Sequence, residues 1–160
     1  MTRPVLLDNT VLTNLSLVGR SDLAFCLWPT NACTTPSVRK EYETGADSGL
    51  LPPETWTELP VVTLTPDEVA FAIRLPPRLG AGERTCLAVA VHRQGLLVSD
   101  DLDARRTARE HNVPTTGTLG ILIRCVQLSH LERDQADGLL AEMIALGYRS
   151  PVDSLAPLLE

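Results

Sequence analysis

The stretch ERTCLAVAVHRQGLLVSDD, residues 83–101, decides the fold of this chain. Cys86 to Val91 is almost wholly apolar and is bounded by charged residues, a pattern that predicts a buried helix over residues 83–93. Gly95 ends this helix, and the run Leu96 to Ser99 predicts a strand that leads directly into two aspartates. A buried helix followed at once by a buried strand is typical of α/β proteins.

The alternation of strands and helices continues on both sides of this stretch. Towards the N-terminus, we expect strands over residues 5–7, 31–35 and 61–64, each followed by a helix, over residues 9–17, 36–42 and 66–75. Towards the C-terminus, we expect a helix over 100–111, a short strand over 113–116 and helices over 117–128 and 132–146. This order predicts a parallel sheet between two layers of helices, a three-layer α/β/α sandwich with right-handed crossovers.

Length and composition are those of one globular domain. Because 44% of the 160 residues are hydrophobic, we expect a single domain over residues 1–160, with helices from about residue 130 packing on it or extending it. An apolar run of only three residues precedes Asp8, so we expect no signal peptide, no membrane contact and a cytoplasmic protein. The absence of a CxxC pair predicts buried free thiols at Cys26, Cys33, Cys86 and Cys125.

The formal net charge of −6 disfavours a broadly basic surface that coats nucleic acid. Such binding draws most of its affinity from Lys and Arg side chains that neutralise phosphates. A local site remains compatible with this charge, because bound divalent cations would cancel several carboxylate charges at the point where phosphate approaches.

Acidic residues follow two of the expected strands, Asp8 after the first and the pair Asp100 and Asp101 after the fourth. Ligands of parallel sheets gather at the carboxyl ends of the strands, and a carboxylate at this rim needs a hydrogen bond or a metal to offset its desolvation. Capping of the following helix is the alternative for each aspartate. Glu83 at a helix start and Glu41 on a helix have similar alternatives, a favourable dipole interaction and a solvated face.

The acids fall in four motifs, and two further motifs follow them. The motifs are VLLDNTVL (5–12), TPSVRKE (35–41), GAGE (80–83), LLVSDD (96–101), ARR (104–106) and VPTTGTLG (113–120). With these motifs, the chain resembles the PIN-domain family over essentially its whole length, in particular a bacterial and archaeal PIN-like branch described as nucleic-acid-binding. The resemblance implies an α/β/α fold and a Mg²⁺- or Mn²⁺-dependent ribonuclease, and many relatives are VapC-type toxins of toxin–antitoxin pairs.

The resemblance also implies roles for the acids Asp8, Glu41, Glu83, Asp100 and Asp101. Asp8 and Asp101 are expected as direct metal ligands together with Glu83, and Glu41 and Asp100 as ligands or as groups that orient water. Ser99 selects Asp101 over Asp100, because the family's hydroxyl residue stands two positions before the acid. Thr85 is a departure, since this branch often carries a second acid there, and this puts the binding of two metal ions in question.

Polar neighbours complete the expected site. Asn9, Thr10 and Ser99 are expected to orient a carboxylate or a metal-bound water, although local capping explains them equally well. Arg105, Arg106 and Arg109 are candidate phosphate contacts, because Arg presents a two-pronged donor to phosphate. All but one of the 14 basic residues are Arg, so composition alone also explains them.

The expected partners are an RNA substrate, an antitoxin protein and a second copy of the chain in a homodimer. Two alternatives keep the fold: a non-catalytic nucleic-acid-binding module, and a latent nuclease whose acidic groove is filled by an antitoxin segment. A response-regulator-like domain also has an acidic pocket, but it explains neither Glu41 nor Glu83.

Overall fold

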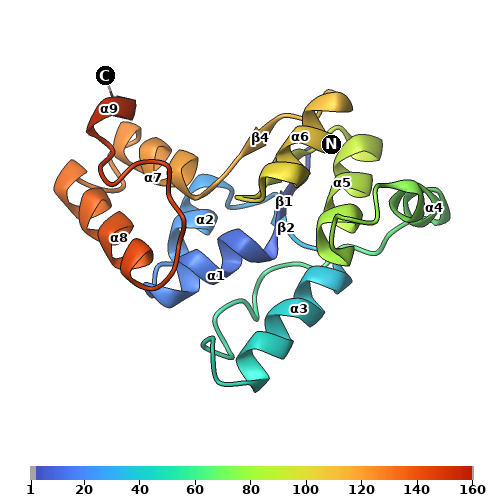
Figure 1. Cartoon of the computed structure of the whole chain (residues 1–160), viewed down its shortest axis with the longest axis horizontal. Coiled ribbons are helices and arrows are strands. Elements are labelled where there is room, and N and C mark those ends of the chain that lie inside the picture. Colours follow the sequence, from blue (N-terminus) through green and yellow to red (C-terminus); the bar gives the residue numbers. More distant parts are fainter. Residues whose placement is uncertain (1–2, 160) are drawn as a thin grey trace.

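A four-stranded parallel sheet forms the centre of the molecule in the computed structural model, which describes residues 3–159 (Figure 1). The strands are β1 (Val5–Leu7), β2 (Ala32–Cys33), β3 (Leu96–Val98) and β4 (Thr115–Thr116). Their order across the sheet is β2-β1-β3-β4. The chain therefore returns to the centre of the sheet with β3, and the first and third strands lie side by side.

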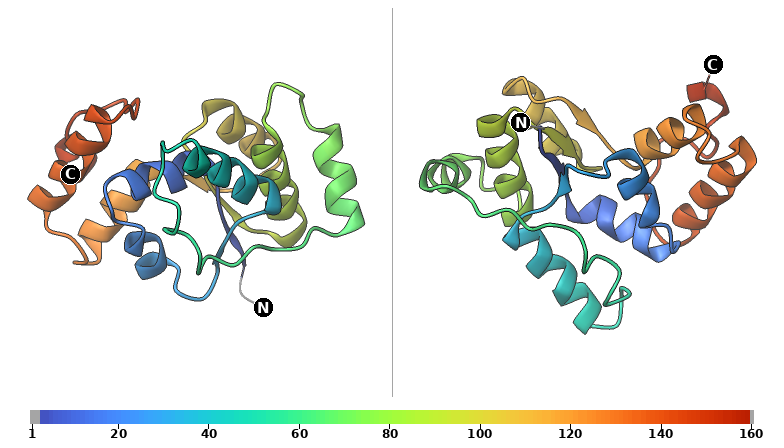
Figure 2. Two further views of the ribbon diagram at one scale, coloured as in Figure 1. Left: turned by 90° about the horizontal axis from the view of Figure 1, so that it is seen from below. Right: turned by 180° about the vertical axis from the view of Figure 1, so that it is seen from behind.

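Helices cover both faces of this sheet. They are α1 (Asn9–Leu17), α2 (Asp22–Leu27), α3 (Pro36–Asp47), α4 (Pro66–Arg74), α5 (Ala81–Arg93), α6 (Leu102–Glu110), α7 (Thr118–Gln127), α8 (Arg133–Ala145) and α9 (Ala156–Leu159). Figures 1 and 2 show α5 and α6 on one face and α1, α2 and α7 on the other, so the predicted three-layer sandwich is confirmed. Within residues 3–159, no helix is long and apolar enough to cross a membrane.

The two central strands bring the candidate site together. Leu6 of β1 is fully buried, as expected for parallel strands covered on both faces, which are continuous hydrophobic runs in the sequence. Leu7 lies opposite Val98 in the paired register. Asp8 and Ser99, the residues that follow, therefore leave the sheet at the same edge and next to each other.

The predicted start of α4 is confirmed. Thr65 accepts a hydrogen bond from the backbone of Glu68, and Glu68 accepts one from the backbone of Thr65, which completes the capping box. The Glu68 carboxylate is buried and also accepts two hydrogen bonds of 2.8 Å from Arg93. Burial alone would raise the pKa of Glu68, but the bonds from Arg93 and Thr65 lower it. This ion pair fixes α4 to the end of α5.

The expected strand over residues 61–64 is wrong. Val61 forms only an isolated bridge with Thr34, and the backbone of Thr34 bonds to Pro60 and Val62. Val61 is also 41% exposed. Because β2 ends at Cys33 and α3 begins at Pro36, the residues after Val62 have no strand beside them, so this apolar, β-branched segment does not extend the sheet.

Other boundaries also differ from the expectation. The helix expected to end at residue 42 continues to Asp47 through Gly45, where a side chain would overlap Leu51 of the returning loop. Helices α2 and α9 were not expected from the sequence. All four cysteines are free thiols, but Cys26 is exposed, because it lies on the outer side of the short helix α2.

Trp56 anchors the long loop between α3 and α4 to the helix that follows Asp8. The Trp56 side chain is 1% exposed, and its indole N–H donates to the Leu12 carbonyl of α1 at 3.2 Å. Arg39 of α3 donates to the carbonyls of Trp56 and Leu59. The loop therefore ties α1 and α3, which carry Asp8 and Glu41, into one unit.

We expect Trp56→Ala to lower the free energy of unfolding by about 3–5 kcal/mol, because it empties a large buried site and removes the bond to Leu12. Urea unfolding followed by circular dichroism measures this loss. Trp28→Ala is the control, since Trp28 is only half-buried. An equal loss in both variants would contradict the anchoring role of Trp56.

Candidate functional site

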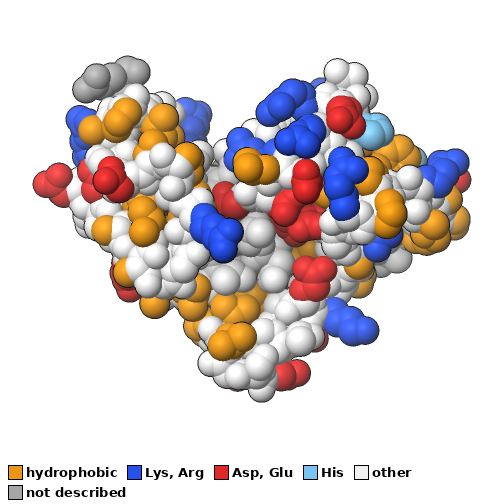
Figure 3. Space-filling model, in the orientation of Figure 1, with side chains coloured by type: hydrophobic (Ala, Val, Ile, Leu, Met, Phe, Trp, Pro, Cys, Tyr) orange, Lys and Arg blue, Asp and Glu red, His pale blue; other side chains and the backbone are white. Residues whose placement is uncertain are grey.

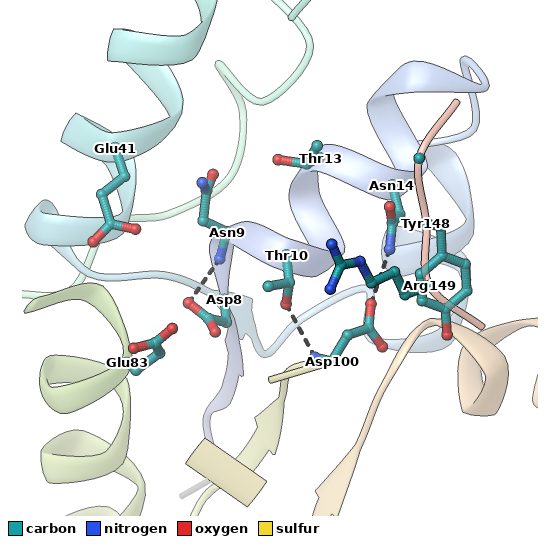
Figure 4. Close-up of a pocket in the computed structure, with 11 residues that line it drawn as sticks. Asp8, Asn9, Thr10, Thr13, Asn14, Glu41, Glu83, Asp100, Tyr148 and Arg149 are labelled. Carbon is teal, nitrogen blue, oxygen red and sulfur yellow. Dashed lines mark hydrogen bonds between the residues drawn. The ribbon is translucent and has the colours of Figure 1, made fainter. Parts of the chain in front are cut away.

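A groove of about 420 Å³ opens at the carboxyl ends of β1 and β3. It is lined by Asp8, Asn9, Thr10, Thr13, Asn14, Glu41, Glu83, Asp100, Gly147, Tyr148 and Arg149. Figure 3 shows acidic side chains gathered at the base of the hollow on this face, with basic side chains around its rim. Figure 4 shows Asp8, Glu41 and Glu83 facing one another from three separate elements. These three carboxylates form what we call the acidic cluster.

Asp8 is the buried member of the cluster. Only 2% of the residue is exposed. One oxygen, Oδ1, accepts from the backbone N–H of Asn9 at 2.8 Å, and Oδ2 accepts from the Ser99 hydroxyl at 2.7 Å. Asp8 is thus the N-cap residue of α1, as the capping alternative predicts, and it also lies in the groove.

Glu41 and Glu83 meet at the N-terminus of α5. Glu41 accepts from the backbone N–H of Gly82 at 2.9 Å, although it lies on an exposed helix face of α3. Glu83 accepts from the backbone N–H of Gly80. A Cβ at Gly82 would lie 2.8–3.0 Å from the Glu41 carboxylate. The glycine of the GAGE motif therefore permits the close approach of Glu41 to α5.

The charged forms of Asp8 and Glu83 are disfavoured in the cluster. The pKa of Asp8 is raised from 3.8 to about 7, mainly by burial; the hydrogen bonds from Ser99 and Asn9 oppose this rise, and the negative charges of Glu83 and Glu41 contribute to it. Burial also raises the pKa of Glu83, with added repulsion from Asp101 and Glu41. Without a cation, the cluster therefore favours partial protonation near neutral pH.

The adjacent aspartates Asp100 and Asp101 have different environments. Asp100 lines the groove, and its carboxylate accepts from the backbone and hydroxyl of Thr118, at 2.8 and 2.5 Å, and from the Asn14 amide at 2.9 Å. It thereby caps α7 from a distance, because the N-cap residue Gly117 has no side chain. Asp101 caps α6 through Ala104, outside the lining of the groove.

Ser99 and Thr10 link these acids to Asp8. The fully buried Ser99 hydroxyl donates to Asp8 and accepts from the backbone N–H of Asp101 at 3.2 Å. The Thr10 hydroxyl accepts from the backbone N–H of Asp100 at 3.0 Å. Both residues thus attach the connection between β3 and α6 to the start of α1.

Comparison with known proteins agrees with this geometry. A family model described as PIN domain matches residues 4–160, nearly the whole chain. The chain belongs to the PIN-domain family. No curated protein matches it. PIN domains are generally nucleases that act on nucleic acid and typically use divalent metal ions.

The arginines expected to meet phosphate are spread out in this PIN domain. Arg105 is half-buried near Gly117, and Arg106 pairs with Asp103 at 3.6 Å. Arg109 is exposed in the last turn of α6 and does not line the groove. The sequence reasoning missed Arg149, which lies in the groove itself. The one sequence signal near Arg149 is Gly147, which predicts a turn after α8. In the structure, Gly147 has a φ of 116°, and the chain folds back there.

Thr85 takes a structural place in this PIN domain. Its hydroxyl lies 2.7 Å from the hydroxyl of Thr35, the N-cap residue of α3, and donates to the backbone of Ala81 and Gly82. Thr85 therefore joins the helices that carry Glu41 and Glu83.

The donor chemistry of the groove fits a hard divalent cation. The available donors are carboxylate oxygens, together with the Asn9 Oδ1 atom, which is buried without a hydrogen-bond partner. Within residues 3–159, no group of three His, Cys, Asp or Glu side chains is already arranged to hold a metal ion. Glu41 and Glu83 instead accept hydrogen bonds from the backbone N–H groups of Gly82 and Gly80 at the start of α5.

The pKa of Asp8 predicts how stability changes with pH in the absence of metal. Because the folded state binds the Asp8 proton more tightly than the unfolded chain, the free energy of unfolding falls as pH rises from about 4 to 7, by at most about 4 kcal/mol. Asp8→Asn removes this contribution, so its curve should fall less steeply. Urea unfolding in EDTA at several pH values measures both curves, and equal slopes would rule out this role of Asp8.

Proposed function

We propose that this PIN domain is a divalent-metal-dependent endoribonuclease that hydrolyses phosphodiester bonds of RNA. The convergence of Asp8, Glu41 and Glu83 from the end of β1, from α3 and from α5 on one open groove carries this proposal. Carboxylates that repel one another are costly when one of them is buried, as Asp8 is, unless a cation joins them. Mg²⁺ and Mn²⁺ are the cations that such an all-oxygen donor set suits.

The chain's own residues have distinct tasks in this proposal. Asp8 is a fixed ligand, because Ser99 and Asn9 hold both of its oxygens in place. Glu41 and Glu83 are ligands or water-orienting groups that turn from the amides of α5 towards the groove. When bound, the cation supplies a hydroxide nucleophile at neutral pH and offsets the charge of the phosphate. Asp101 joins as a ligand, which its repulsive effect on the pKa of Glu83 supports.

A non-catalytic nucleic-acid-binding module is the second candidate. Thr85 in place of an acid and the open arrangement of the carboxylates favour it. We further propose a toxin role, in which the basic segment of an antitoxin protein occupies the acidic groove. Its test is growth arrest on expression of the chain, with relief of the arrest by Asp8→Asn.

We expect the purified chain to cleave RNA with Mg²⁺ or Mn²⁺ and to be silenced by EDTA. Asp8→Asn should abolish cleavage without unfolding the chain, because it relieves repulsion within the cluster. Asp47→Asn, at the exposed end of α3, is the matched control and should keep wild-type activity. Cleavage that persists in EDTA would sink the metal mechanism, and folded wild-type protein without any cleavage would favour the binding module.

The adjacent aspartates should separate stability from catalysis. Asp100→Asn should lower the free energy of unfolding by about 1–3 kcal/mol, because Thr118 and Asn14 lose a charged hydrogen-bond acceptor. Asp101→Asn should lose Mn²⁺ affinity and cleavage far more severely, as a direct ligand does. Thermal unfolding, calorimetric titration with Mn²⁺ and an RNA cleavage assay measure the two variants side by side. The reverse pattern would move the ligand assignment to Asp100.

A further inference from the structure

A second hollow of about 280 Å³ adjoins the acidic groove. The two share Asp100, Tyr148 and Arg149 as a common wall, and the second hollow adds Leu102, Arg105 and Leu119. We call it the flanking hollow. Its walls come from the start of α6, the start of α7 and the segment that follows α8. The two hollows therefore lie next to each other, and a polymer with one phosphate at the acidic cluster lies close to the flanking hollow.

Two arginines border the flanking hollow without a carboxylate partner. The ion pairs of the described residues 3–159 use Arg20, Arg78, Arg93 and Arg106. Arg105 and Arg149 take part in none of them, although Asp100 lines the same hollow. Arg149 is exposed, and Figure 4 shows it extending from the C-terminal segment across the groove towards Thr10. Both guanidinium groups are therefore available to a phosphate, to which Arg donates through two N–H groups.

Apolar side chains form the rest of the flanking hollow. Leu102 is 77% exposed at the first position of α6, beside the half-buried Leu119 and Tyr148. A single exposed leucine is ordinary. An exposed leucine and a tyrosine ring that share a hollow with two unpaired arginines, however, match what a nucleotide presents, a flat apolar base and an anionic phosphate.

We propose that the flanking hollow binds a nucleotide of a single-stranded nucleic acid, next to the nucleotide that is cleaved. Its phosphate lies between Arg105 and Arg149, and its base packs against Leu102 and Tyr148. This inference rests on the proposed function, and it names the substrate as a single strand. In a duplex, both faces of a base are stacked on neighbouring bases, so the base cannot pack against Leu102 and Tyr148.

The segment that follows α8 then has a role in recognition. Arg149 and Tyr148 follow α8 directly, after the turn at Gly147. The chain beyond α8 thereby places the Arg149 guanidinium in a groove whose other charged residues are all acidic. The positive charge of Arg149 makes RNA binding compatible with the net charge of −6, because the phosphate of the polymer meets an arginine where it enters the site.

The test is binding of a fluorescent single-stranded RNA of about 12 nucleotides, measured by anisotropy in EDTA so that no cleavage occurs. Arg149→Ala should weaken binding on the order of 10-fold and lower the salt dependence by about one phosphate contact. Leu102→Ala should weaken binding without changing the salt dependence. Arg133→Ala removes the same charge from the exposed start of α8 and should remain within about 2-fold of wild type.

Two results would overturn the flanking hollow as a nucleotide site. One is equal binding by Arg149→Ala and Arg133→Ala, and the other is a duplex of the same sequence bound as tightly as the single strand. Cleavage by the wild-type chain with Mn²⁺ is scored separately. If it cleaves and Arg149→Ala binds normally, only the hollow is wrong. If it does not cleave but Arg149→Ala weakens binding, the hollow stands and the nuclease proposal falls.

Discussion

The positions of the acidic residues in this molecule depend on helix N-termini that meet at one edge of a parallel sheet. β1 and β3 end side by side, and each passes the chain to a helix at that edge. The first turns of these helices have backbone N–H groups without partners inside the helix. A carboxylate takes each of these positions: Asp8 at α1, Glu41 and Glu83 at α5, Asp101 at α6 and Asp100 at α7.

Capping and metal binding are therefore not competing explanations for these acids. A carboxylate has about four lone-pair positions, so a residue that accepts from a backbone N–H keeps capacity for another partner. Helix N-termini favour negative charge, which lets five acids gather in a small volume. The pKa of Asp8 is nevertheless raised, mainly by burial and further by the charges of Glu83 and Glu41, so this compensation is incomplete. On the proposed function, the remaining repulsion is what a divalent cation removes.

The sequence predicted the features that depend on neighbouring residues. The apolar runs of β1 and β3, the capping box at Thr65 and the PIN-domain resemblance are of this kind, and the structure and the family match confirm them. The strand expected at Val61 failed, because strand formation depends on a partner that the local pattern does not contain. Arg149 was missed for a similar reason, since only the path of the chain after α8 brings it to the groove.

The most direct test of the account is the location of Mn²⁺ in crystals grown with that ion, by its anomalous scattering. We expect a peak in the groove beside Asp8, with Glu41 or Glu83 turned from the amides of Gly82 and Gly80 towards the ion. Under saturating Mn²⁺, an empty groove in which both glutamates still accept from those amides would contradict it. In that case, the acids of this PIN domain would be helix caps alone.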